Sequence, residues 1–113
     1  FKGDLLEVML ATAQGRLADL PPVRFGTDAA LTVVIAAEGY PGTPRAGGRI
    51  AGTDRAEATG ALVFHAGTRL ESHELVASGG RVLAVTGRGP TVAAAQAAAY
   101  DAVGRIDFAD GFH

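Results

Sequence analysis

The sequence has few or none of several residue types, and each absence excludes a class of structure or function. It has no cysteine, which removes disulfides and thiolate chemistry and fits a cytoplasmic location. No apolar run approaches the roughly 18 residues of a membrane-spanning helix, so membrane insertion is excluded. The net charge of −2 and the pI of about 5.9 leave no basic footprint for nucleic acid. Lys2 is the only lysine, so a bound anion would be held by arginine.

What the sequence does contain indicates one folded domain. Its 113 residues, 48% hydrophobic and 19% charged, are enough for a single core. The segment Leu31–Gly42 reads LTVVIAAEGYPG. Its first half is β-branched and apolar on both pleat faces, which predicts a central strand covered on two sides. The polar and glycine-rich residues 38–42 that follow place a turn at the end of this rigid element, where we look first for function.

The remaining pattern predicts an α+β fold with a mainly antiparallel sheet and a packed C-terminal helix. A helix is expected over 4–17, ended by a stiff linker at 19–22, and a second helix over 91–105 with Thr91 as its N-cap. Strands are expected at 30–37, 61–66, 68–77 (two segments around a turn near 71–73) and 81–86. The segment 43–60 should be a surface excursion with at most a short strand at 49–51. The residues expected to be largely buried are Leu31, Val33, Ile35, Leu62, Phe64, Val82, Ala84, Val103 and Ile106.

The search for local motifs is mostly negative. Gly87 and Gly89 lack the third glycine of a dinucleotide fingerprint, and the single lysine cannot complete a P-loop. We therefore predict no cofactor-binding residues in this chain. His65, His73 and His113 are too scattered for a local metal motif, so no metal ligands are predicted either.

Four motifs in order carry a family resemblance: AAEGYPGTPRAG, VFHAGT, GGRVLAVTGRG and AYDAVGRIDFADGF. This series resembles the carboxyl-terminal domain of the glycinamide ribonucleotide synthetases, the phosphoribosylamine-glycine ligases of purine biosynthesis. The resemblance runs from about residue 4 to residue 113. It implies that residues 1–20 are the helix and linker leaving an ATP-grasp core, and that residues 21–113 form the C-terminal domain, which packs on that core.

The resemblance also implies a function for the complete enzyme. A ligase of this family joins glycine to 5-phosphoribosylamine with ATP and Mg²⁺, both held by regions outside this sequence. The piece alone should be catalytically inert, with no catalytic residue of its own, and should form one wall of the active site. Two alternatives stay open, namely a stand-alone α+β interaction module and the C-terminal domain of another ATP-grasp carboxylate-amine ligase.

Within that wall, Arg81 is the first candidate for the ribose 5-phosphate. It follows Gly79 and Gly80 at the start of a strand, where a slim backbone admits a ligand and the guanidinium can bind a phosphate with two hydrogen bonds. The alternative is a surface ion pair. Tyr40, with the backbone of Gly39 and Gly42, is the second candidate.

For that loop, the alternative is a purely structural turn. His65 and Thr68 are the third candidates, and for them a buried, hydrogen-bonded turn is the favoured interpretation. All seven predicted substrate-binding residues lie at the ends of expected strands, and they are Gly39, Tyr40, Gly42, His65, Thr68, Gly80 and Arg81.

Overall fold

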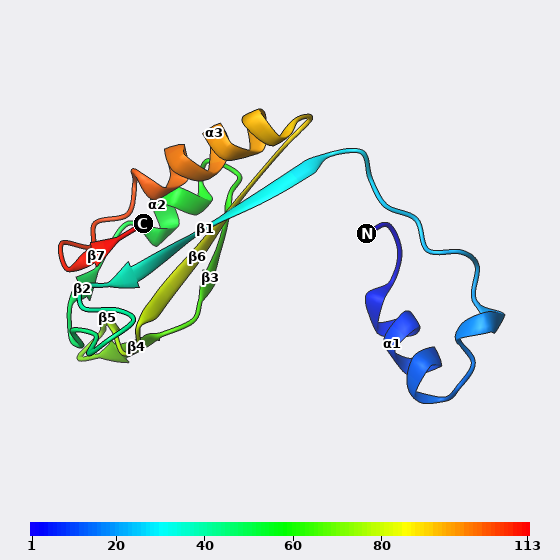
Figure 1. The fold of residues 1–113 in the computed structure, drawn as a ribbon, viewed down its shortest axis with the longest axis horizontal. Coiled ribbons are helices and arrows are strands. Elements are labelled where there is room, and N and C mark those ends of the chain that lie inside the picture. The colour runs from blue at the N-terminus through cyan, green and yellow to red at the C-terminus, as the bar shows by residue number, and fades with distance from the viewer.

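The computed structural model describes residues 1–113 and shows an α+β domain with a separate amino-terminal segment (Figure 1). The α+β fold class predicted from the sequence is confirmed, because every strand pairing is antiparallel and a long helix packs near the C-terminus. The elements follow one another as α1, a 3₁₀ turn, β1, β2, α2, β3, β4, β5, β6, α3 and β7.

The amino-terminal segment is held together by local contacts. Helix α1 spans Leu5–Ala13, and the Asp4 carboxylate caps it by accepting hydrogen bonds from the backbone N–H groups of Leu6 and Glu7. The helix ends before the predicted residue 17 because Gly15 has φ +67°, outside the helical region. A 3₁₀ turn at Leu17–Asp19 follows.

The main sheet has four strands in the order β3-β6-β1-β7. Its long central pair is β1, Ala29–Ala37, against β6, Arg81–Gly89. Strand β3, Leu62–His65, pairs on the outer side of β6, and the short β7, Gly111–Phe112, pairs with the end of β1. The strands β1 and β6 run in opposite directions, so the end of β1 and the start of β6 meet at one edge of the molecule.

A second sheet of three short strands lies beside that edge, in the order β2-β5-β4. Strand β2 spans Arg49–Ile50, β4 spans Thr68–Glu71 and β5 spans Glu74–Ala77. The predicted turn between β4 and β5 is confirmed at Ser72 and His73, which adopt φ +50° and +71° in a two-residue hairpin loop.

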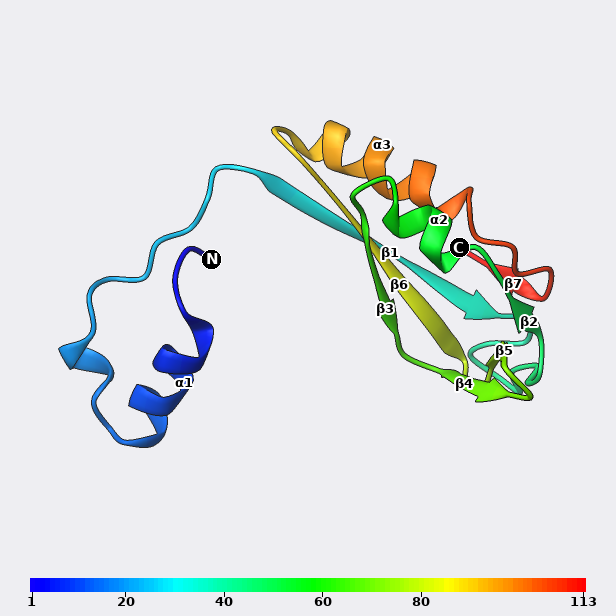
Figure 2. The ribbon, with the colours of Figure 1, turned by 180° about the vertical axis from the view of Figure 1, so that it is seen from behind.

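Helix α3, Val92–Val103, covers one face of the main sheet, and Thr91 caps it through its hydroxyl and the Ala94 N–H. The alanines of the helix allow close packing, because a Cβ on Gly87 of β6 would collide with the helix backbone near Ala95 and Ala99. The α3 side of the sheet also carries the short helix α2, Thr53–Glu57, whereas no element lies against the opposite face (Figures 1 and 2).

This one-sided cover corrects two sequence-based expectations. Leu62 and Phe64 are 48% and 54% exposed, and Val63 between them is the buried residue of β3 because it faces α3. Strand β1 is likewise not buried on both faces, since Val34 is 43% exposed. Of the other residues expected to be buried, four are buried and three are partly buried: Val33, Ile35, Val82 and Val103, then Leu31, Ala84 and Ile106.

Two elements were missed in the sequence. Helix α2 lies inside the segment 43–60, where Ala56 is fully buried under α3, and β7 follows a predicted helix end. The expected short strand at 49–51 is present as β2. None of the helices is both long enough and apolar enough to cross a bilayer.

Candidate functional site

Three loops meet where β1 ends and β6 begins. The Ala37 N–H donates to the Gly80 carbonyl at 2.8 Å, which joins the loop after β1 to the loop before β6. The loop after β3 is joined to the same place, because the N–H groups of Ala66 and Gly67 both donate to the Val82 carbonyl, at 3.0 and 3.1 Å. Ser78 completes the cluster by donating its N–H to the Gly67 carbonyl at 2.8 Å. The three predicted groups of site residues therefore lie together in space.

The loop after β1 turns back on itself at Gly39. Gly39 has φ +89°, and a Cβ there would collide with the Thr43 carbonyl, so a larger residue does not fit. The Tyr40–Pro41 peptide bond is cis. The phenol ring of Tyr40 lies over Gly80, where it fills the space that a Cβ would need. Tyr40 as a whole is 39% exposed, so the residue remains accessible at the junction of the loops.

The guanidinium of Arg45 links the two ends of the same loop. Arg45 donates to the Glu38 carboxylate at 3.0 Å and to the Asp110 carboxylate at 2.9 Å. The backbone repeats the connection, because the Arg45 N–H donates to the Glu38 carbonyl and the Glu38 N–H donates to the Asp110 carbonyl. We call these three residues the Arg45 clasp. It ties both ends of the Tyr40 loop to the segment before β7.

The clasp was missed in the sequence analysis. Opposite charges flanking a Gly/Pro loop, Glu38 before it and Arg45 after it, are a signal that could have found half of it. Asp110 lies 65 residues from Arg45 along the chain, and no local pattern connects the two.

Glycines allow the chain segments at the start of β6 to pack closely. Gly67 and Gly79 lie against each other, since a Cβ on Gly79 would come within 3.3 Å of the Gly67 Cα. A Cβ on Gly67 would also come within 2.6 Å of the Arg81 carbonyl oxygen, so there is no room for a side chain at position 67. Arg81 follows directly, paired across the sheet with Ala36 next to a β-bulge.

Arg81 differs from the other arginines of the domain in having no partner. From residue 29 onward, every other arginine forms an ion pair with a carboxylate: Arg45, Arg49, Arg55, Arg69, Arg88 and Arg105. The Arg81 side chain is exposed and forms neither an ion pair nor a side-chain hydrogen bond. The surface ion pair that was the alternative interpretation of Arg81 is therefore absent.

The third predicted group is a hydrogen-bonded turn, although an exposed one. His65 Nδ1 and the Thr68 hydroxyl lie 3.0 Å apart, at the end of β3 and the start of β4. His65 is exposed and Thr68 is half-buried, so the expected burial of this turn is wrong. Alternation along β3 puts His65 on the side of Val63, so the uncovered face that exposes Leu62 and Phe64 does not account for the exposure of His65.

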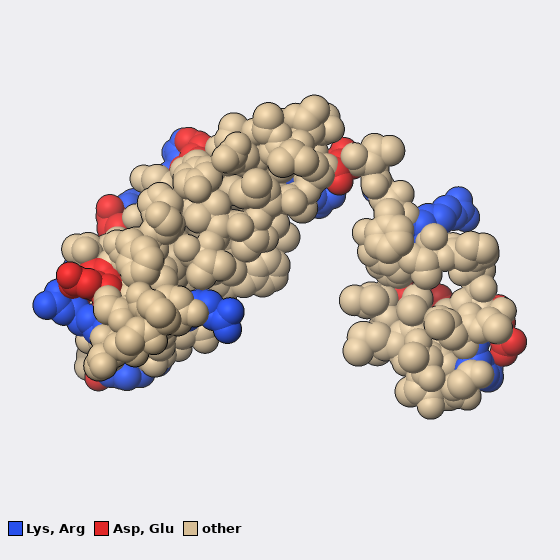
Figure 3. All heavy atoms as spheres, viewed as in Figure 1, with Lys and Arg blue, Asp and Glu red and all other residues tan.

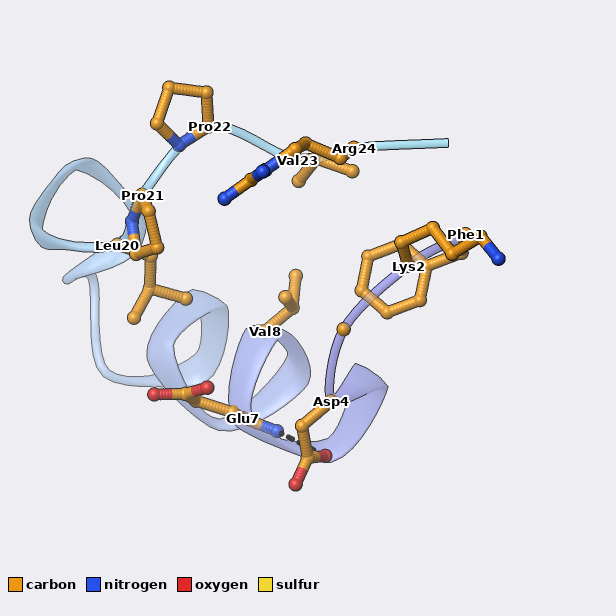
Figure 4. A pocket seen from close by; sticks show the side chains of 11 residues that line it. Phe1, Lys2, Asp4, Glu7, Val8, Leu20, Pro21, Pro22, Val23 and Arg24 are labelled. Carbon is orange, nitrogen blue, oxygen red and sulfur yellow. Dashed lines mark hydrogen bonds between the residues drawn. The ribbon is translucent and has the colours of Figure 1, made fainter. Parts of the chain in front are cut away.

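The hollows of the surface lie elsewhere. All three are in the amino-terminal segment or where it joins the domain, and none is lined by a predicted site residue. Figure 4 shows the first of them, a groove between α1 and the extended residues 20–24, with Val8 and Leu20 pointing toward it. The candidate site is thus an open surface in this chain rather than an enclosed pocket.

Comparisons with known proteins agree on one family. The family model described as "Phosphoribosylglycinamide synthetase, C domain" matches residues 30–113. The phosphoribosylamine–glycine ligases of Mesorhizobium japonicum and Phenylobacterium zucineum are 51% and 49% identical to this chain over 98% of its length. In both cases the chain spans 26% of the relative, about a quarter of its length.

A solved structure gives the same result. The crystal structure of the phosphoribosylamine–glycine ligase of Thermotoga maritima matches with a TM-score of 0.66 and 35% identity. The match covers 73% of this chain and 20% of that one.

Proposed function

The chain belongs to the phosphoribosylglycinamide synthetase C-domain family, and we propose that it forms one wall of the active site of a phosphoribosylamine–glycine ligase. The full-length enzyme joins glycine to 5-phosphoribosylamine at the expense of ATP in purine biosynthesis. The single observation that carries this proposal for the site is the unpaired Arg81 at the junction of three loops.

Arg81 has the role of binding the 5-phosphate of phosphoribosylamine. The guanidinium is a planar fork that matches two phosphate oxygens, and here no carboxylate of the chain competes for it. The space beside Gly79 and Gly80 is taken by Gly67 and by the Tyr40 ring, so the phosphate binds at the exposed guanidinium rather than at the backbone of these glycines. Tyr40 and the backbone of Gly39 and Gly42 form the adjacent rim, against which the ribose lies.

His65 and Thr68 belong to the edge of this wall. Their mutual hydrogen bond fixes the turn between β3 and β4, and the free Nε2 of the exposed imidazole can reach a substrate hydroxyl. Their role is to position the substrate, and none of these residues takes part in the bond-making steps.

The residues of this chain offer no cluster of ligands for Mg²⁺, and the sequence has no phosphate-binding motif for ATP. No group of three or more His, Asp or Glu side chains could hold a metal ion, and the site carboxylates Glu38 and Asp110 are both engaged by Arg45. We assign both cofactors to other regions of the full-length ligase, and the isolated chain should be inactive. This chain contributes binding and orientation of the phosphoribosyl group, which is a large part of catalysis when the reactants are separate molecules.

The test uses a hybrid ligase, in which this chain replaces the matching quarter of the Mesorhizobium japonicum enzyme. A charge-assisted bidentate contact contributes roughly 2–3 kcal/mol, so Arg81→Ala should lower kcat/KM for phosphoribosylamine by a factor on the order of 30 to 150. The KM for ATP should stay nearly unchanged. Arg81→Lys should recover only part of the loss, since an ammonium cannot form the two parallel hydrogen bonds of the fork.

Arg88→Ala is the matched control, because Arg88 lies on the same strand at its other end and is paired with Asp28. It should leave kcat/KM for phosphoribosylamine within about twofold, as expected for a surface ion pair. An Arg81→Ala hybrid with wild-type kinetics for phosphoribosylamine would contradict the assignment and shift it to Tyr40 and its loop.

A further inference from the structure

The face of the main sheet opposite α3 is an apolar surface that nothing in the chain covers. Cross-strand pairing places two rows of three residues on it, one row from Thr32, Thr86 and Leu62 and one from Val34, Ala84 and Phe64. We call these six residues the open face. We propose that the open face is the surface on which the remainder of a full-length ligase polypeptide packs. This inference rests on the proposed function, because it takes its occupant from the family.

The open face has the chemistry of a buried interface. Phe64, Leu62 and Val34 are 54%, 48% and 43% exposed, and none of the six residues is charged. Figure 3 shows that uncharged atoms make up most of the visible surface of the domain, with the charged groups mostly near its edges. A contiguous apolar patch of this kind marks an interaction surface more often than a solvent-facing one.

The two hydroxyl groups of the open face already have a hydrogen-bond partner within the sheet. The Thr32 and Thr86 oxygens lie 2.8 Å apart and hydrogen-bond to each other across the strands. A partner that displaces water from this face leaves neither hydroxyl without a bond, so its dehydration carries little polar cost.

Two observations identify the occupant. The chain spans 26% of the relatives that it matches, so a full-length ligase has about three quarters of its length available to cover this face. The chain also has a second uncovered apolar surface, on α1, where Leu6 is 72% exposed and Met9 61%. An extended linker joins helix α1 to the domain, and α1 and the open face do not cover each other (Figure 1). The remainder of the same polypeptide can cover both apolar surfaces at once.

The chain has no cysteine, so a single introduced cysteine reports on one site. Phe64→Cys places a thiol on the open face, and Val92→Cys places one at the start of α3, on the other side of the sheet, where Val92 is 66% exposed. Each variant is labelled with a maleimide, both as the isolated 113-residue chain and within the hybrid ligase. Tryptic peptides separate the two positions from each other and from cysteines elsewhere in the hybrid.

We expect both thiols to be labelled rapidly in the isolated chain. In the hybrid ligase, labelling of Phe64→Cys should slow on the order of tenfold or more, as for a site that reacts only when the structure opens locally. Val92→Cys should be labelled at its original rate. Since this readout needs no catalytic activity, it can fail while the Arg81 test succeeds, and the reverse also holds.

Three results would overturn the proposal. Equal labelling of Phe64→Cys in the isolated chain and the hybrid would show that nothing packs on the open face. Slow labelling already in the isolated chain would assign the face to a second copy if light scattering gives a dimer, or to the chain's own amino-terminal segment if it gives a monomer. Equal protection of both thiols in the hybrid would show that the open face has no special part in the packing.

Discussion

The contact between Tyr40 and Gly80 predicts a specific coupling between two loops. A Cβ on Gly80 would collide with the Tyr40 ring and would also come within 3.2 Å of the Pro44 side chain. Gly80→Ala therefore overpacks the junction, at a cost of about 1–3 kcal/mol in the free energy of unfolding. Gly80 does not have a positive φ, so the substitution also removes unfolded-state entropy, which returns about 0.4–1 kcal/mol. The expected net loss is about 1–2 kcal/mol.

The assay is a double-mutant cycle followed by urea denaturation of the isolated chain. Tyr40→Ala alone should cost about 1 kcal/mol, because the ring is only partly buried. In the double variant the new methyl group occupies space that the ring has left, so the two losses should not add, and the coupling should be about 1–2 kcal/mol. Gly79→Ala is the control for a neighbouring glycine, with a contact of only 3.3 Å to another glycine Cα.

The cycle also has a clear negative outcome. If the losses from Gly80→Ala and Tyr40→Ala add within about 0.5 kcal/mol, the ring does not lie over Gly80 in solution. The Tyr40 ring would then not be part of the rim that we propose for the phosphoribosyl group.

Three further predictions follow from the fold and the site. In the isolated chain, Val63→Ala should lower the free energy of unfolding by about 1.5–3 kcal/mol, whereas Phe64→Ser, which removes a half-exposed ring, should lower it by at most about 1 kcal/mol. Urea denaturation measures both losses, and a larger loss for Phe64→Ser would mean that the wrong side of β3 has been assigned to the core. Arg45→Ala should cost at most about 1 kcal/mol in stability but should speed amide hydrogen exchange over residues 39–44, and unchanged exchange would exclude a role for the clasp in fixing that loop. Calorimetry of the isolated chain should detect no ATP binding, and a micromolar dissociation constant would contradict the assignment of the nucleotide to other regions.

The sequence predicted most elements of the domain because their signals are local. Thr91 before a run of alanines indicates a helix start, and β-branched runs bounded by glycines indicate β1 and β6. Helix α2 gave no such signal. It has five residues, and it is held by burial of Ala56 under α3 rather than by any pattern of its own.

The site was predicted in its parts but not in its assembly. Glycine, tyrosine and arginine at strand ends were noticeable as residue types, yet their meeting depends on the antiparallel pairing of β1 with β6, which puts the end of one beside the start of the other. The Arg45 clasp shows most clearly what sequence patterns cannot predict. Its Asp110 oxygen comes from a segment that lies near Arg45 only once the sheet has formed.

The error in β3 has a cause that bears on the whole chain. Leu62, Val63 and Phe64 are all apolar, so the alternation that normally indicates which side of a strand is buried is missing. Such a run is typical of a strand buried on both faces, and the sequence was interpreted in that way for β1 as well. The structure supplies a cover for only one face. If the second cover is the remainder of the ligase, the sequence-based expectation that Leu62 and Phe64 are buried holds for the full-length enzyme. The labelling of Phe64→Cys in the hybrid ligase decides between that interpretation and a simple mistake about which side of β3 is buried.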